Sequence, residues 1–62
     1  MIKEEAIMLL KKIESKPSSE IDQEQDHITA DRILLYFLKT NGYDDLAEAY
    51  ESTRERIGFF YS

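Results

Sequence analysis

The chain contains no cysteine and no tryptophan, and its 62 residues include only two glycines, one proline and one histidine. Without cysteine, neither a disulfide nor a thiolate metal site can stabilise the fold, so a small disulfide-rich secreted domain is excluded and a reducing, cytoplasmic compartment is expected. No apolar run reaches the roughly 20 residues that cross a bilayer, and the first residues mix Lys with Glu, unlike a signal peptide. We therefore expect a soluble, unexported protein with no membrane partner.

Size and charge limit the functions that the chain can support. Its 62 residues allow one domain, expected to span 1–62, near the lower limit at which a chain folds unaided. The formal net charge of −5 opposes binding to nucleic-acid phosphates and favours basic partners. A domain this small seldom encloses a pocket large enough to desolvate a substrate, so we expect no enzymatic activity and no cofactor.

Hydrophobic periodicity predicts an amphipathic first helix over about 2–16. Its apolar residues fall within one arc at helical pitch, with charged residues outside that arc. They are Ile2, Ala6, Leu9, Leu10 and Ile13. Pro17 and the serines after it end this helix and begin a polar connection over about 17–24.

The second helix is predicted over about 25–41, with Ser19, Asp22 and Asp26 as alternative N-caps. Its wide apolar face holds Ala30, Ile33, Leu34, Phe37 and Leu38. Ile28 and Leu35 form a smaller second patch. Because this helix is apolar on more than one side, we expect it to lie between other helices.

Asn41-Gly42 is the strongest turn signal, because glycine at C′ takes the left-handed conformation at little steric cost and lets Tyr43 fold back onto Leu38. A third helix is predicted over about 45–57, capped by Asp44 or Asp45 and ended by Gly58, before an aromatic tail over 58–62. Its apolar stripe is Leu46, Tyr50, Thr53 and Ile57. The fold class is therefore all-α: a small three-helix domain built on an antiparallel helical hairpin, with the first helix laid across it.

The single histidine suggests one candidate polar site. If the second helix began early, Glu20, Glu24, His27 and Asp31 would form a ridge, and Glu24-x-x-His27 has the spacing used in carboxylate-bridged metal bundles. Such bundles need this motif on two helices, so this site would require a dimer, acting as a metal-dependent hydrolase. We favour the simpler interpretation that His27 and Asp31 form a hydrogen-bonded pair at i and i+4 at the edge of the core. No metal is then expected.

Other chemistry is weakly indicated. The acidic residues of the third helix are explained by capping, the helix dipole and solvation, and no serine has a base at activating spacing. Arg54 and Arg56 next to Phe59, Phe60 and Tyr61 interleave charge with stacking surfaces, yet the basic residues form no stripe, so a nucleic-acid partner is not favoured.

Apolar residues outside the main stripes are the candidates for a protein partner or a homodimer. Ile7 and Met8 lie off the main face of the first helix, and Tyr36 lies opposite Leu34 and Leu38 on the second. The terminal Phe59, Phe60 and Tyr61 are expected to turn back across the hairpin or, if exposed, to join such a patch.

The string "HITADRILLYFLKTNGYDDLAEAYES", followed by a terminal aromatic pair, resembles a loose group of small uncharacterised proteins of tailed bacteriophages and prophages. The matching positions are His27, Ala30, Asp31, Leu34, Gly42, Tyr43, Ala49, Tyr50, Glu51, Phe60 and Tyr61. Where that group usually ends in Trp-Tyr-Ala, this chain has Phe60-Tyr61-Ser62. The resemblance implies an accessory product made in a bacterial cytoplasm that acts on a host or phage protein, and it implies no catalytic residues.

Overall fold

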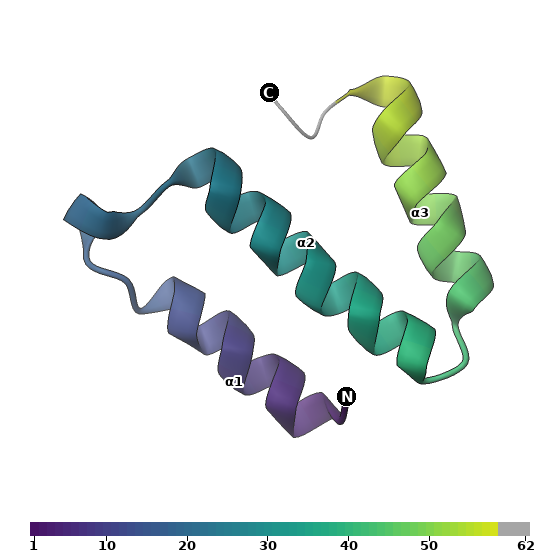
Figure 1. Cartoon of the computed structure of the whole chain (residues 1–62), viewed down its shortest axis with the longest axis horizontal. Coiled ribbons are helices and arrows are strands. Elements are labelled where there is room, and N and C mark those ends of the chain that lie inside the picture. The colour runs from purple at the N-terminus through teal and green to yellow at the C-terminus, as the bar shows by residue number, and fades with distance from the viewer. Residues whose placement is uncertain (59–62) are drawn as a thin grey trace.

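The computed structural model describes residues 1–58 and shows an all-α fold (Figure 1). Three α-helices follow one another along these residues, with one turn of 3-10 helix, η1, at Ser18–Glu20. They are α1 at Lys3–Glu14, α2 at Gln23–Thr40 and α3 at Asp44–Ile57. The described residues contain no strand, so the predicted small three-helix, all-α fold is confirmed.

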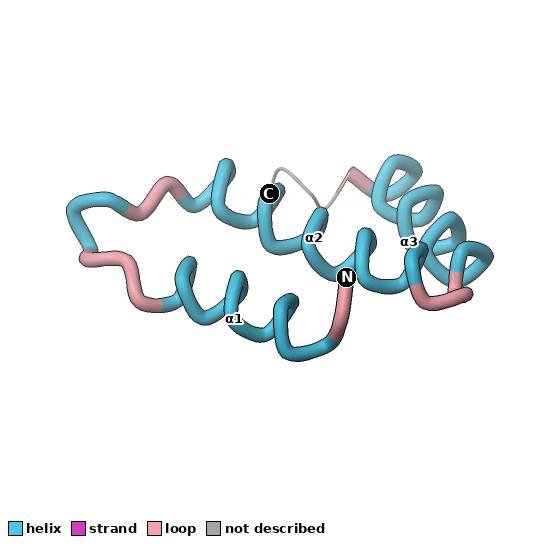
Figure 2. The backbone as a smooth tube through the Cα atoms, turned by 60° about the horizontal axis from the view of Figure 1, so that its bottom comes forward, coloured by secondary structure: helices cyan, strands magenta, loops and turns pink. Residues whose placement is uncertain are grey.

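The helices lie side by side in a layer that is one helix thick. α2 is in the middle and contacts both α1 and α3, whereas α1 and α3 do not contact each other. The Cα positions extend 36 × 29 × 9 Å, and Figures 1 and 2 both show α1 alongside α2. The expectation that the first helix lies across the hairpin is therefore wrong: α1 lies at one edge of the layer and α3 at the other.

The buried core of the described residues is small, with one residue from each helix. Leu35 of α2 is 5% exposed, and the alanines Ala6 and Ala47 are 8% and 0% exposed. Small side chains on α1 and α3 let those helices approach α2 closely. Because only one neighbour covers each side of α2, much of the remaining apolar surface stays open.

Two predicted apolar faces are only partly buried. On α2, Leu34 of the predicted main face is 52% exposed, while Leu35 of the smaller patch is the buried residue. On α3, Ala47 is buried, whereas Leu46 and Ile57 of the predicted stripe are 55% and 65% exposed. The predicted α3 stripe is therefore wrong as a description of the core, whereas the predicted main face of α2 is half-buried at Ala30, Ile33, Phe37 and Leu38 and exposed at Leu34. A single layer buries only the sides of the helices that face each other.

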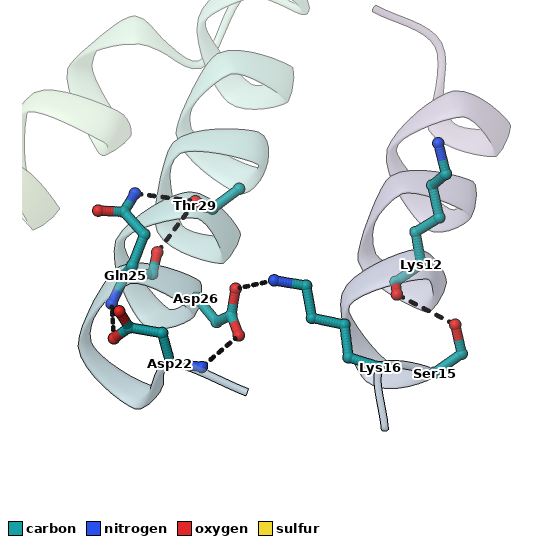
Figure 3. Close-up of polar contacts among 7 residues, drawn as sticks. All are labelled: Lys12, Ser15, Lys16, Asp22, Gln25, Asp26 and Thr29. Atoms are coloured by element: carbon teal, nitrogen blue, oxygen red, sulfur yellow. Dashed lines mark hydrogen bonds and ion pairs between the residues drawn. The ribbon is translucent and has the colours of Figure 1, made fainter. Parts of the chain in front are cut away.

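Asp22 is the N-cap of α2 and settles the choice among the three candidate caps. Its Oδ1 accepts a hydrogen bond from the Gln25 backbone N–H at 3.0 Å, and its own N–H donates to Asp26 Oδ2 at 3.1 Å. Lys16, in the connection just after α1, donates from its Nζ to Asp26 Oδ1 at 2.7 Å (Figure 3). This network ties the segment that follows α1 to the start of α2.

The turn between α2 and α3 follows the glycine signal. Gly42 has φ of 88°, and the Tyr43 N–H donates to the Leu38 carbonyl at 2.9 Å, which is the backbone closure of a Schellman motif. The predicted Asp caps of α3 are wrong. Tyr43 occupies the N-cap position without a side-chain hydrogen bond, since one residue alone separates Gly42 from α3. Asp44 and Asp45 lie in the first turn, where the helix dipole favours them.

Specific hydrogen bonds also fix the end of α3 and the segment that precedes α1. Gly58, with φ of 76°, ends α3 as predicted, and its N–H donates to the Arg54 carbonyl at 2.9 Å. At the start of α1, the Asn41 side-chain amide donates to the Met1 carbonyl at 3.1 Å, which ties this segment to the end of α2. None of the helices in residues 1–58 combines the length and the apolar character that crossing a membrane requires.

Candidate functional site

α2 has two faces that neither neighbour covers. Asp26 pairs with Lys16, in the connection that follows α1, while Asp31 and Lys39 pair with residues of α3 on the other side of α2. At about 100° per residue, Leu34 and Tyr36 are about 160° apart around the helix, so they lie on opposite faces of the layer. We call these the Leu34 face and the Tyr36 face.

Asp31 is the centre of a polar contact between α2 and α3. Its Oδ2 accepts hydrogen bonds from Arg54 Nη1 at 3.2 Å and from the Tyr50 hydroxyl at 3.3 Å. The Asp31 and Arg54 side chains are only 13% and 17% exposed. Desolvation raises the pKa of Tyr50. The charge of Asp31 and the hydrogen bond between Asp31 and Tyr50 raise this pKa further, and the charge of Arg54 lowers it. Arg54 also lies 5.9 Å from the Tyr50 ring centroid.

His27 and Asp31 lie close together as predicted, but the distance between them exceeds that of the expected hydrogen bond. His27 Nε2 lies 3.7 Å from Asp31 Oδ2, which is an ion-pair distance for a protonated histidine and too long for a hydrogen bond. The oxygen that His27 approaches is the one that already accepts from Arg54 and Tyr50. The sequence pattern did not indicate Tyr50 and Arg54 as partners of Asp31, although their i, i+4 spacing on α3 places both on the side that faces α2.

The ridge of four metal-ligand candidates is not formed on one helix. Glu20 lies in η1 and Glu24 in the first turn of α2, because α2 begins at Gln23 rather than earlier. Within residues 1–58 no group of three or more His, Asp or Glu side chains is placed to hold a metal ion. The condition on which the Glu20-to-Asp31 ridge depended is therefore not met.

The Tyr36 face contains an open pocket of about 560 Å³ between α2 and α3. Its lining residues are Met1, Thr29, Arg32, Ile33, Leu35, Tyr36, Lys39, Glu51 and Arg54. Lys39 Nζ and Glu51 Oε1 span the two helices at 3.0 Å. Three cationic side chains and one carboxylate therefore surround an apolar floor, in a chain whose net charge is −5.

The Leu34 face is apolar. Tyr50 contacts Asp31, which lies on the Leu34 side of α2, so Tyr50 belongs to this face. The residues at i−4 and i+7 from Tyr50, Leu46 and Ile57, share its side of α3 and are 55% and 65% exposed. Leu34 itself is 52% exposed. The stripe predicted for the third helix thus points to one face of the layer rather than into the core.

The other candidate contact residues are partly described. Tyr36, Ile7 and Met8 are 56%, 47% and 59% exposed, so each is accessible to a partner. The predicted positions of Phe59, Phe60 and Tyr61 lie outside the described residues. Arg54, one of the two arginines considered for nucleic acid, is held by Asp31.

Comparisons with known proteins give no relative: no protein-family model, curated protein or solved structure matches this chain significantly.

Proposed function

We propose that this chain acts by binding another protein through the Tyr36 face, without catalysis. The observation that supports this most directly is Tyr36, a large aromatic that is 56% exposed beside a pocket lined by Arg32 and Arg54. Tyrosine and arginine are enriched among the residues that dominate binding energy at protein interfaces. With the phage resemblance, this makes the chain an accessory protein that binds a host or phage protein in the bacterial cytoplasm.

The pocket is better suited to binding than to catalysis. Its open shape leaves water in contact with any bound group, whereas catalytic sites gain from excluding water. Lys39 and Glu51 neutralise each other across the pocket at 3.0 Å. The Thr29 hydroxyl donates to the Gln25 carbonyl at 2.9 Å, so its proton is directed away from any acceptor in the pocket.

The charges around the pocket indicate the chemistry of the partner. Lys39 is paired with Glu51 and Arg54 with Asp31, so Arg32 is the cationic side chain of the lining that no carboxylate of residues 1–58 holds, and Leu35 with Ile33 supplies apolar surface beside it. A segment that offers a carboxylate beside an apolar side chain complements this arrangement. The local preference for an acidic segment differs from the preference for basic partners that the net charge alone suggests.

A capture experiment with matched variants tests this function. Immobilised wild type, Tyr36→Ala and Ile21→Ala are each incubated with bacterial lysate, and the retained proteins are quantified by mass spectrometry. Ile21 is a suitable control because it is 50% exposed between η1 and α2, away from the pocket lining. We expect a protein that wild type and Ile21→Ala retain and that Tyr36→Ala does not.

The purified partner then provides the decisive measurement. Its Kd, measured by calorimetry, should rise at least about 30-fold in Tyr36→Ala, which corresponds to the roughly 2 kcal/mol of an interface hot spot. Arg32→Glu should weaken binding in the same direction. If every captured protein binds Tyr36→Ala as tightly as wild type, the Tyr36 face is not the binding site.

Two other functions predict different results. A dimeric metal-dependent hydrolase requires a stoichiometric divalent ion that is lost in His27→Ala. A nucleic-acid-binding protein requires binding that weakens steeply with salt and with Arg54→Ala or Arg56→Ala. Either result would replace the proposed function.

A further inference from the structure

We infer that the segment which binds the Tyr36 face is an amphipathic α-helix of about three turns, with a carboxylate directed at Arg32. This segment belongs to the partner of the proposed function, so the inference rests on that function and specifies the partner that it needs. The length of the pocket, the elements that form its walls and the charges in its lining support a helix over other segments.

The pocket of the Tyr36 face is an open groove that follows α2. Its α2 lining begins with the i, i+3, i+4, i+7 spacing of one helical stripe and continues towards the end of the helix. The residues of this stripe are Thr29, Arg32, Ile33, Tyr36 and Lys39. From its first to its last residue the stripe is about 15 Å long, which is the length of a helix of about ten residues.

Both walls of this groove are helical. α2 and α3 use their backbone N–H and C=O groups in their own hydrogen bonds, and the described residues contain no strand. A partner strand would therefore find no sheet edge to extend, and its backbone groups would lie unpaired against Ile33 and Leu35. A helix satisfies its backbone internally, so it can lie on this apolar floor without that cost.

The lining also disfavours two other kinds of segment. Grooves that bind proline-rich segments are lined by several aromatic side chains, whereas Tyr36 is the only aromatic residue of the described lining. Phosphorylated segments are bound by clusters of arginines that have no other partner. Here Arg54 is held by Asp31 at 3.2 Å. Lys39 is held by Glu51 at 3.0 Å. A helix laid in a groove is the recurring mode that this lining accommodates.

Arg32 determines the polar contact of the partner helix. It is exposed, and no carboxylate of residues 1–58 forms an ion pair with it. A partner carboxylate would accept charge-assisted hydrogen bonds from its planar guanidinium, which fixes the direction of the contact. Arg32 and Tyr36 are one turn apart on α2. The partner helix should therefore carry Asp or Glu three or four positions from a large apolar residue that packs on Ile33 and Tyr36.

Selection from a library of random peptides of about 16 residues, long enough for three helical turns and both caps, tests this inference. The library is passed over immobilised Tyr36→Ala, which removes peptides that bind elsewhere, and is then selected on wild type. We expect the enriched peptides to carry apolar residues at helical period, with Asp or Glu at the spacing given above. Because isolated helices of this length are marginal in water, each peptide should gain helicity in far-UV circular dichroism when it is mixed with the protein.

Matched substitutions separate the helix from the charge. In the tightest peptide, Pro at the centre should raise the Kd from fluorescence anisotropy at least about 30-fold, whereas Pro at the first helical position should change it little. Arg32→Glu should raise the Kd of this peptide at least about 10-fold, and a peptide with Lys in place of its acidic residue should bind Arg32→Glu more tightly than wild type. Arg56→Glu is the matched control, because Arg56 is exposed and outside the pocket lining, and it should leave the Kd unchanged. Far-UV circular dichroism verifies that each variant is folded.

Each outcome decides a separate point. Enriched peptides that tolerate the central Pro would overturn the helix, and equal binding to Arg32→Glu and wild type would overturn the carboxylate contact. No enriched peptide that depends on Tyr36 would overturn the inference as a whole. A wild type that doubles its mass of 7.3 kDa in sedimentation equilibrium, and a Tyr36→Ala variant that does not, would make a second copy the occupant instead. The proposed function survives if extended peptides are selected, and it fails only if captured proteins bind Tyr36→Ala as tightly as wild type, so the two failures are distinguishable.

Discussion

Replacing Leu35 with alanine should remove a large part of the stability of this protein. Leu35 is 5% exposed and is the only large side chain among the three buried residues of the described chain. Leu→Ala removes three carbons, worth about 2.4 kcal/mol at ~0.8 kcal/mol for each buried CH₂. A residual cavity adds to this cost, within an observed range of about 2–5 kcal/mol.

The position of Leu35 sets where in that range the cost should lie. Leu35 lines the open pocket of the Tyr36 face, so water and neighbouring side chains can reach the vacated space and limit the cavity. We therefore expect a loss of about 2.5–3 kcal/mol. At ~0.05–0.15 kcal/mol per residue the whole domain is stabilised by only about 3–9 kcal/mol, so this loss is more than about a quarter of the total.

Urea unfolding followed by circular dichroism measures this loss, and Leu34→Ala is the matched control. The two variants remove the same atoms from adjacent positions, but Leu34 is 52% exposed, so its substitution should cost about half as much or less. The comparison is made at the lowest protein concentration that gives a signal, where any dimer has dissociated. If Leu34→Ala costs as much as Leu35→Ala there, Leu35 is not the centre of the core.

Three further perturbations address the helix ends. Asp22→Ala should cost about 0.5–2 kcal/mol in urea unfolding, because it removes the side-chain cap of α2, and Asp22→Asn should restore most of it. The hydrogen bond from Lys16 and that from the Asp22 backbone lower the pKa of Asp26 below its usual 3.8. The stability that Asp26 contributes is thus present above about pH 4 and is lost as the pH falls through its lowered folded pKa. Lys16→Met, which removes the partner of Asp26, should therefore lose less stability in acid than wild type; an equal loss would contradict this. Gly42→Ala should cost about 1–2 kcal/mol from its φ of 88° alone, since no atom lies within 4 Å of the added Cβ; an unchanged urea midpoint would show that the turn rearranges.

The helices could be predicted from the sequence because their signals are local. Hydrophobic periodicity, Pro17 after α1 and the glycines at 42 and 58 act over one or two turns, and each has its expected counterpart in the structure. The choice of Asp22 among three candidate caps was not predictable. It depends on Asp26 and on Lys16 of the connection that follows α1, which no short window of sequence brings together.

The sides on which the helices meet could not be predicted in the same way. Apolar residues surround most of α2, so periodicity alone does not distinguish Leu34 from Leu35 as the buried position. The contact from Asp31 to Arg54 joins residues 23 positions apart, and it becomes visible only when α3 is placed beside α2. The α3 stripe was recognised as apolar. Its exposure could not be predicted, because it follows from the arrangement of the three helices in one layer, which the pattern of a single sequence does not encode.

Because α1 and α3 each contact α2 and not each other, either outer helix can detach while the remaining pair stays packed. Local opening should therefore occur in two separate units, and native-state amide exchange should report different opening free energies for α1 and α3. The amides in the middle of α2 should be the slowest to exchange, since both units must open before they are fully exposed. A protein organised this way can have one edge remodelled, by cleavage or by a bound molecule, without losing order at the other.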